Sequence, residues 1–522
     1  MLKQSILLVL ASAATVSVAM GIAVAPYETD APPHMVPPLS SALDGLASAK
    51  QKASGIRRSR LCSDEVFLRR AFLDVIGTLP SHDEAAEFLA DKNLSKRAQL
   101  IDRLLERPEF ADYWGMKWGD ILRVKSEFPV NLWPNAAQAY DRWIRTSLRQ
   151  NIPYSEFARQ LLTAGGSNFR NPPVNFIRSA GSREPSALAA AAALTFLGER
   201  TDGWKPARQA DLAFFFSRVG FKASGEWKEE IVYFLPPADG AAVTATLPDG
   251  SKVAVPPTAD PREVFAQWLI TSPTSPFARN AVNRVWFWLF GRGIIDEADD
   301  SRPDNPPSNP ELLAWLARQF QAAKYDTKQL FRIILNSETY QLSSIPRDDN
   351  AAAAFAAYPV RRLEAEVLLD AINQITGGKE DYVSRIPEPF TFLPEDIRAI
   401  NVPDGSISSS FLETFGRPPR DTGHLGERTT NITASQRLTL LNSKGMLSKI
   451  NGSRKLKTLL QSVRSPDEAV SALYLTCLSR YPTPDERAAI SDSLPALATG
   501  NKANLNDIAW ALLNSPEFLY RH

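Results

Sequence analysis

Residues 416–428 carry the densest group of ion-binding side chains on a stiff backbone in this chain. The segment reads Gly-Arg-Pro-Pro-Arg-Asp-Thr-Gly-His-Leu-Gly-Glu-Arg. Its two prolines restrict the backbone between two arginines, and guanidinium groups bind carboxylates or sulfates through paired hydrogen bonds. The pattern predicts an anion-binding site formed by Arg417, Arg420, Asp421, His424, Glu427 and Arg428. The alternative is that these residues form ion pairs that tie the loop to the fold.

Residues 296–305, Asp-Glu-Ala-Asp-Asp-Ser-Arg-Pro-Asp-Asn, form a second polar loop. Oxygen ligands at this density can bind Ca²⁺, but the spacing and the glycine of an EF-hand are missing. The favoured interpretation is a solvated turn fixed by Asp300 and Arg302. We also predict that residues 296–309 contribute to the anion site, because Ser308 opens a helix whose amino terminus favours negative charge.

Other familiar chemistry is missing from the sequence. The four histidines are scattered, and no two have the spacing of metal ligands, so we predict no metal site. Phosphate-binding, dinucleotide-binding, serine-hydrolase and zinc-protease motifs are absent. Whether the protein is an enzyme stays open, because catalytic groups are often dispersed in sequence. Cys477 lies in an apolar run and is predicted to be a buried hydrophobe, with a bridge to Cys62 as the alternative.

The start of the chain predicts export. A basic tetrapeptide precedes residues 5–25, which are uncharged, mostly apolar and end in Ala-Val-Ala, as in a secretory signal. The alternative for residues 1–25 is an uncleaved membrane anchor. Both interpretations place the rest of the chain in the periplasm or at the cell surface. The proline-rich segment 26–55 is predicted to be a linker, and the net charge of +1 argues against a nucleic-acid partner.

Helix signals dominate the remaining chain. Ser81 and Glu84 form a capping-box pattern, and residues 96–107 place their leucines on one face. The alanine-rich run 187–197 is apolar all round, so it is predicted to be a buried helix that Ser186 caps and Gly198 ends. A further apolar stripe, 361–375, ends at a glycine pair.

One region has the pattern of strands. Residues 231–235 are β-branched and aromatic, and residues 243–255 alternate around Pro-Asp-Gly-Ser, which is a hairpin signal. We therefore predict a mainly α fold with two helical domains, 56–227 and 261–522, and a small antiparallel β insert at 228–260 between them.

The chain also contains an internal repeat. Residues 71–84 match 473–486 in pattern without gaps, and 104–110 match 512–518 in the same order. A looser third copy covers 334–340. Each copy is an apolar helix end followed by a stop, an acid and an aromatic residue. Two linked matches favour a repeated helical module, although capped helices can converge on such patterns.

Several longer stretches are similar to a known family. Residues 67–80 and 103–114 resemble the planctomycete cytochrome-C-like domain, and the runs at 280–308, 340–343 and 415–420 resemble the domain of unknown function that accompanies it. The resemblance implies an exported, mostly helical bacterial protein with no established activity. Members of this family usually carry C-x-x-C-H after the alanine-rich helix, but residues 198–211 here contain no cysteine and no histidine. Since covalent haem needs both, we predict no haem and no other cofactor.

Three functions follow as hypotheses. The first is a non-haem envelope protein that binds a protein partner or an anionic polysaccharide. The second is a hydrolase or lyase of extracellular glycans that uses Asp and Glu as acid and base. The third is a haem-less subunit of a redox complex. The membrane is a partner only if residues 1–25 remain uncleaved.

Overall fold

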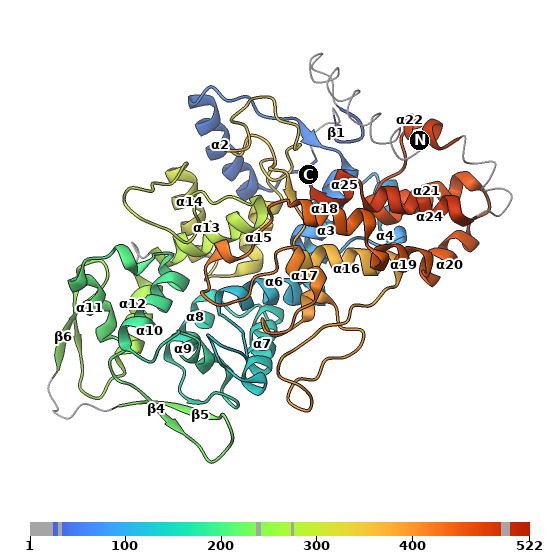
Figure 1. Ribbon diagram of the computed structural model, residues 1–522. Helices are drawn as coiled ribbons and strands as arrows, with labels where there is room; N and C mark the ends of the chain where they lie inside the picture. The colour runs from blue at the N-terminus through green and yellow to red at the C-terminus, as the bar shows by residue number, and fades with distance from the viewer. Residues whose placement is uncertain (1–23, 30–33, 236–241, 273–275, 492–501) are drawn as a thin grey trace.

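The computed structural model describes residues 24–29, 34–235, 242–272, 276–491 and 502–522 (Figure 1). The predicted signal segment lies almost wholly outside these residues. Helices make up most of the described chain, and the described sheets have two or three strands, so the predicted mainly α fold is confirmed. Within the described ranges, no helix is both long enough and apolar enough to cross a membrane.

Many helices begin with proline, which has no N–H group to leave unpaired in the first turn. The helices of the first half are α2 (Pro38–Ala53), α3 (Asp64–Val75), α4 (His82–Ala90), α5 (Lys96–Glu106), α6 (Pro108–Ile121), α7 (Pro134–Arg149), α8 (Tyr154–Thr163), α9 (Asn175–Arg178), α10 (Pro185–Ala192) and α11 (Pro206–Phe214). Short 3₁₀ or π turns are η1 (Pro172–Val174), η2 (Ala193–Leu197), η3 (Thr201–Gly203), η4 (Ala399–Asn401) and η5 (Leu425–Glu427).

The helices of the second half are α12 (Pro261–Thr271), α13 (Pro276–Phe290), α14 (Pro310–Ala322), α15 (Thr327–Leu335), α16 (Ala365–Thr376), α17 (Ser410–Thr414), α18 (Ala434–Asn442), α19 (Lys444–Asn451), α20 (Arg454–Ser462), α21 (Pro466–Leu478), α22 (Pro484–Ser491), α24 (Lys502–Leu513) and α25 (Pro516–Leu519). The predicted stripe at 361–375 corresponds to α16. It ends at Gly377, whose φ of 69° suits a left-handed helix stop.

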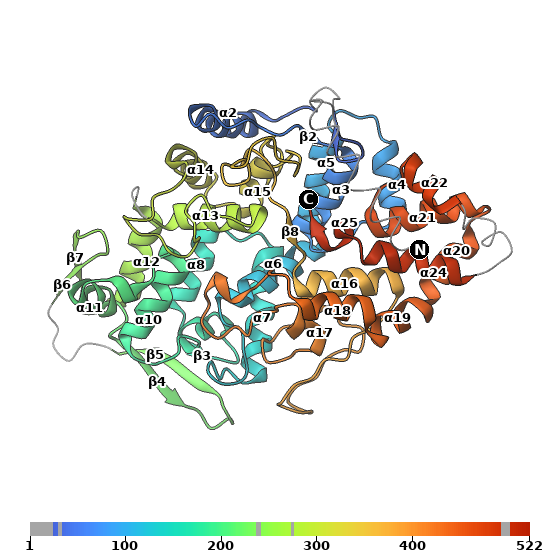
Figure 2. The ribbon, with the colours of Figure 1, turned by 45° about the horizontal axis from the view of Figure 1, so that its top comes forward.

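The β region is larger than predicted. The predicted hairpin is present as β6 (Val243–Thr246) and β7 (Lys252–Val255). The predicted strand at 231–235 is β5 (Glu230–Phe234), which pairs antiparallel with both β4 (Val219–Ala223) and β3 (Gly166–Ser167). Figure 2 shows the β4–β5 hairpin projecting from the helical body. Two-residue pairs complete the sheets: β1 (Glu28–Thr29) with β2 (Leu61–Cys62), and β8 (Arg361–Arg362) with β9 (Tyr520–Arg521).

The segment predicted to be a linker contains a packed helix. Helix α2 lies against α14 and α15, with Leu43 fully buried. The carboxylate of Asp44 accepts hydrogen bonds from the backbone N–H groups of Glu338 and Thr339, each at 2.8 Å. Leading prolines concealed this helix, although a proline at the first helical position does not prevent one.

Two predicted helix caps are also corrected. Asn309, not Ser308, caps α14 by accepting from the N–H of Leu312, because the Ser308 hydroxyl donates to a backbone carbonyl instead. Helix α10 begins at Pro185, so Ser186 lies inside its first turn. The Ser81 capping box and the left-handed stop at Gly198 are confirmed.

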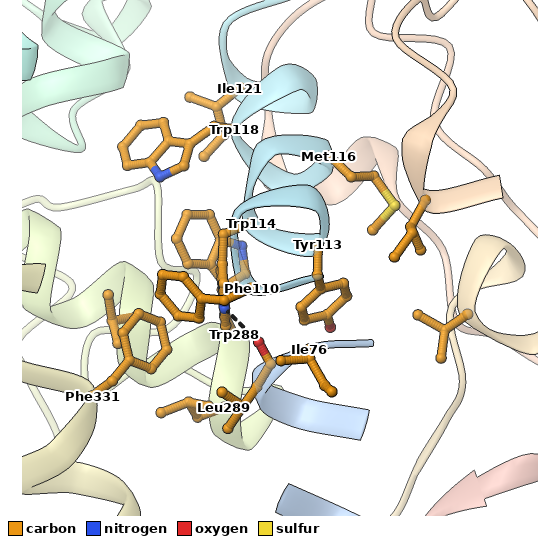
Figure 3. Packing of buried hydrophobic residues seen from close by; sticks show 14 of the residues in the cluster. Ile76, Phe110, Tyr113, Trp114, Met116, Trp118, Ile121, Trp288, Leu289 and Phe331 are labelled. Atoms are coloured by element: carbon orange, nitrogen blue, oxygen red, sulfur yellow. Dashed lines mark hydrogen bonds between the residues drawn. The ribbon is translucent and has the colours of Figure 1, made fainter. Parts of the chain in front are cut away.

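One continuous hydrophobic core runs through both halves of the chain. Figure 3 shows its centre, where Trp114 of α6 packs on Trp288 of α13 and Phe331 of α15. The ring centroids of Trp114 and Phe331 are 4.6 Å apart, and those of Trp114 and Trp288 are 5.2 Å apart. Trp114 and Trp288 are therefore core residues, while the division into two domains stays a prediction.

The two copies of the predicted repeat have the same local structure. Helices α3 and α4 form the first copy and α21 and α22 the second, and α4 packs against α21. Figures 1 and 2 both show these helices side by side, although they come from opposite ends of the described chain. Gly77 and Ser479 hold equivalent positions after α3 and α21, and both have left-handed φ angles, 60° and 61°.

Candidate functional site

The two polar loops singled out in the sequence meet at Asp299. One oxygen of this carboxylate accepts from the backbone N–H of Leu425 at 3.0 Å and lies 3.3 Å from Nδ1 of His424. The other oxygen accepts from Arg200 at 2.8 Å. Burial raises the pKa of Asp299, but the bonds from His424, Arg200 and Leu425 outweigh burial and lower it overall. The carboxylate is therefore charged and serves as the joint between the loops.

The arginines predicted to bind an anion are buried and paired. Arg420 is 1% exposed, and it donates to Asp120 at 2.9 Å and to backbone carbonyls. Arg428 donates to Asp120 at 2.7 Å and to Glu366 at 2.6 Å. Arg417 pairs with Glu366 and donates to two carbonyls. The structure thus differs from the anion-site prediction, because these guanidinium groups attach the loop to acids on α6 and α16.

The other predicted residues also have partners inside the protein. Asp421 accepts from Lys125 at 2.6 Å, and Glu427 accepts from the backbone N–H of Asp421 at 3.1 Å. Asp300 and Arg302 pair at 3.1 Å, as expected for a turn that fixes itself. The site residues named from sequence therefore come together as a structural ion network. Its members are too well paired to form an open binding surface.

One groove of the molecule is relevant to the hypothesis of a hydrolase or lyase that uses Asp and Glu as acid and base. It measures 500 Å³ and contains Asp370, whose pKa burial raises to about 6. A raised pKa suits a general acid, but both oxygens of Asp370 already accept backbone N–H groups, from Ala399 at 2.7 Å and from Ile400 at 3.2 Å. Two other carboxylates in the groove, Glu84 and Glu109, are paired with Arg107. The geometry favours structural roles for these acids.

An open groove of 650 Å³ lies beside the β4–β5 hairpin. We call it the hairpin groove, and its lining comes from residues 129–131, 178, 181–183 and 223–230. Its lining includes an ion triad in which Glu230 pairs with Arg178 at 2.8 Å and with Arg183. The lining as a whole is balanced in charge, with three basic residues and three glutamates, but two of its cations, Arg183 and Lys228, are exposed and can be reached by an anion.

The rim of the hairpin groove combines aromatic rings with accessible cations. Trp227 is 70% exposed, and the side chain of Arg183 is 63% exposed. The ammonium of Lys228 lies 5.4 Å from the ring centroid of Trp227 and 5.6 Å from that of Trp133. The acids of the lining are paired: Glu226 with an exposed arginine, Arg170, and the buried Glu229 with serine hydroxyls.

Two family models match the chain. One, described as a protein of unknown function, DUF1549 or PSCyt2, matches residues 42–225. The other, described as a protein of unknown function, DUF1553 or PSD1, matches residues 261–494. This is the planctomycete cytochrome-C-like pairing of domains of unknown function. The chain belongs to this paired family. No curated protein and no solved structure matches it.

Covalent haem does not fit the PSCyt2 part of this chain. Residues 198–211 supply neither thiols nor an imidazole. Cys62 and Cys477 are free thiols with no exposed surface, so the alternative of a bridge between them is wrong. Burial raises the pKa of Cys477 to about 12 and keeps this thiol protonated. Across the described ranges, no group of three or more His, Cys, Asp or Glu residues could hold a metal ion.

The hairpin groove was not predicted from sequence. The predicted β insert began at residue 228, so the turn that carries Trp227 was divided between two regions. A usable signal was present, since Ser224-Gly225-Glu226-Trp227 places an aromatic residue inside a turn between two strand-like runs. The contributions of residues 129–131 and 181–183 had no local signal, because only tertiary packing brings them to the hairpin.

Proposed function

We propose that this PSCyt2–PSD1 protein is exported and binds an acidic extracellular polysaccharide in the hairpin groove, without haem. The observation that carries the proposal is the exposed indole of Trp227 at the rim of an open groove that also presents Arg183 and Lys228. An exposed indole beside exposed cations offers a large, rigid apolar contact surface next to charged groups, which suits the binding of a ligand with both characters. Export is supported by the signal-like pattern of residues 1–25.

The chemistry of the groove suits an acidic sugar polymer. A planar indole can pack against the C–H face of a sugar ring, since it offers a large, rigid apolar surface. Guanidinium and ammonium groups at the rim can bind the carboxylate of a uronate or a sulfate ester. An open groove is also accessible to one stretch of a long chain, which a closed pocket is not.

Affinity electrophoresis tests this proposal directly. Native protein should be retarded in gels that contain polygalacturonate or dextran sulfate but not in gels that contain neutral dextran. Added salt should weaken the retardation, because it screens exposed charges. Trp227→Ala and Lys228→Ala should each raise the apparent Kd about tenfold, as expected for the loss of a central contact.

Tyr481→Ala is the matched control, because Tyr481 is also an exposed aromatic residue, at 46%, but lies next to α22. It should leave the retardation unchanged. Equal migration of native protein in all three gels at low salt would rule the polysaccharide out and favour a protein partner. Fractionation of cells into cytoplasm, periplasm and envelope tests export, and recovery of the protein from the cytoplasm would contradict that part.

A further inference from the structure

A second cavity, independent of the hairpin groove, has one apolar and one basic wall. It measures 210 Å³, and we call it the alanine pocket. Its lining residues are Ile121, Arg123, Phe176, Ser179, Ala180, Ala187, Ala190, Ala191, Leu194, Thr195, Arg200, Thr201, Asp202, Thr422 and His424. Segment 178–183 separates it from the hairpin groove, since Ser179 and Ala180 face the pocket while Arg178 and Arg183 face the groove.

The apolar wall is one face of α10 and η2. Ala187, Ala190, Ala191 and Leu194 follow the spacing of a single helix face, and all four remain partly exposed. The opposite face of this helix is buried. The sequence predicted that the whole helix was buried because it is apolar all round. The structure corrects this, because one apolar face lines a cavity that no side chain of the described residues fills.

Two side chains of α13 hold the backbone of the apolar wall in place through hydrogen bonds. Residues 193–197 form a π-helical turn, which leaves backbone carbonyls without their usual partners. The buried side chain of Arg284 donates to the carbonyl of Thr195 at 2.8 Å and to that of Leu194 at 3.3 Å, and Asn280 adds a bond to Thr195 at 3.0 Å. π turns are frequent at functional sites.

The opposite wall is basic. The Nε of Arg123 donates to the carbonyl of Asp421 at 2.9 Å, and its two terminal nitrogens have no acceptor among the described residues. Arg200 pairs with Asp299 at 2.8 Å and with Glu297 at 2.6 Å, and its Nε is buried without a hydrogen-bond partner among the described residues. His424 also borders the pocket, and the one acid in the lining is Asp202.

We propose that the alanine pocket binds a small amphipathic carboxylate, with its apolar body against the alanine face and its carboxylate on the free guanidinium nitrogens of Arg123. The two walls differ in polarity, as this class of ligand requires, and a guanidinium matches a carboxylate in charge and geometry. A volume of 210 Å³ suits about seven to ten non-hydrogen atoms, since a water-sized group occupies roughly 30 Å³.

Titration calorimetry on the full chain with hexanoate and hexanamide tests this inference. The two probes have the same number of non-hydrogen atoms and differ in charge. Hexanoate should bind with a Kd of about 1 mM or tighter, and hexanamide at least tenfold more weakly. Absence of heat with hexanoate at about 10 mM, or equal binding of the two probes, would overturn the proposal.

Variants separate the two walls. Arg123→Gln should weaken hexanoate about tenfold and leave hexanamide unchanged. Ala190→Leu should weaken both probes, because the added side chain fills the cavity. Arg149→Gln, at a 56% exposed arginine on α7, and Trp227→Ala should change neither. Should Arg123→Gln fail to fold, the comparison of hexanoate with hexanamide on native protein still decides the matter.

Discussion

The two copies of the helical repeat build the same ionic trio in opposite environments. Each trio joins one arginine to two glutamates at equivalent positions. One glutamate belongs to the capping box, and the other follows the proline that begins α6 in the first copy and α25 in the second. The first trio is Arg107 with Glu84 and Glu109, and the second is Arg480 with Glu486 and Glu517. The arginines are not equivalent, because one follows α5 and the other follows α21.

Burial separates the two trios. Side chains of the first are 24–41% exposed, whereas those of the second are 2–7% exposed. The second copy is covered because α21 packs on α4, and Arg69 of α3 donates to the carbonyls of Cys477 and Phe518. The comparison shows that the same arrangement of charges contributes differently to the stability of the fold in different surroundings. An exposed pair contributes little, while a buried charge that loses its partner costs much.

Removal of the arginine from each copy gives the largest expected difference. Arg480→Ala should lower the free energy of unfolding by about 3–5 kcal/mol, because two buried carboxylates lose their partner. Arg107→Ala should cost about 1 kcal/mol or less, because water reaches its partners. Urea denaturation measures both values. Equal losses in the two variants would show that burial does not distinguish the copies.

Exchange of the left-handed residues after α3 and α21 should give a smaller, asymmetric effect. A Cβ at Gly77 would lie 2.5 Å from Cδ2 of Tyr113, so Gly77→Ser should cost about 2–3 kcal/mol through overlap and backbone strain. Ser479→Gly should change stability by about 1 kcal/mol or less, because the buried hydroxyl has no hydrogen-bond partner among the residues that the structure describes and glycine accepts this φ. Thermal unfolding of the two variants checks this, and a tolerated Gly77→Ser would mean that α6 can move.

A lower pH should reduce the stabilisation from the second ion trio more than that from the first. Burial raises the pKa of Glu517, but the ion pair with Arg480 outweighs burial and lowers the pKa overall. A lowered folded-state pKa stabilises the protein above about pH 4.3, the unfolded value, and that contribution is lost as pH falls through the folded value. The hydrogen bond from Arg107 lowers the pKa of Glu109 as well, but water screens this more exposed pair, so Glu517→Gln should reduce the loss of stability between about pH 5 and pH 3 more than Glu109→Gln does. If the urea midpoints of the two variants changed equally with pH across this range, burial would not distinguish the two trios.

Removal of the capping side chain from each of the two capping boxes should give the smallest losses of stability, and the two losses should be equal. Ser81 caps α4 together with Glu84, and Thr483 makes the same reciprocal bonds with Glu486 at the start of α22. Ser81→Ala and Thr483→Ala should each cost about 1 kcal/mol, because each removes one bond to a backbone N–H. Calorimetric melting of both variants measures this. A much larger loss for Thr483→Ala would mean that its effect passes through the buried trio.

Local features were predictable from sequence, and long-range partners were not. The Ser81 capping box, the β6–β7 hairpin and the repeat depend on residues a few positions apart, so their signals survive in the linear pattern. Arg420 also gave a correct signal that it binds carboxylates. Its partner Asp120 lies 300 residues away, and no pattern identifies such a pair. For the same reason, loops that form a network of ion pairs were interpreted as an open site.

Arg521 has a consequence for the synthesis of the protein. Its side chain has no exposed surface, and it bonds to the carbonyl of Leu73, 448 residues earlier, as well as to Glu364. At about 5–20 residues per second, a ribosome needs roughly 20–90 s to synthesise the chain from Leu73 to Arg521. Throughout that interval the carbonyl of Leu73, near the end of α3, lacks this guanidinium. The contact therefore forms only after the 448 residues that separate its two partners have been synthesised.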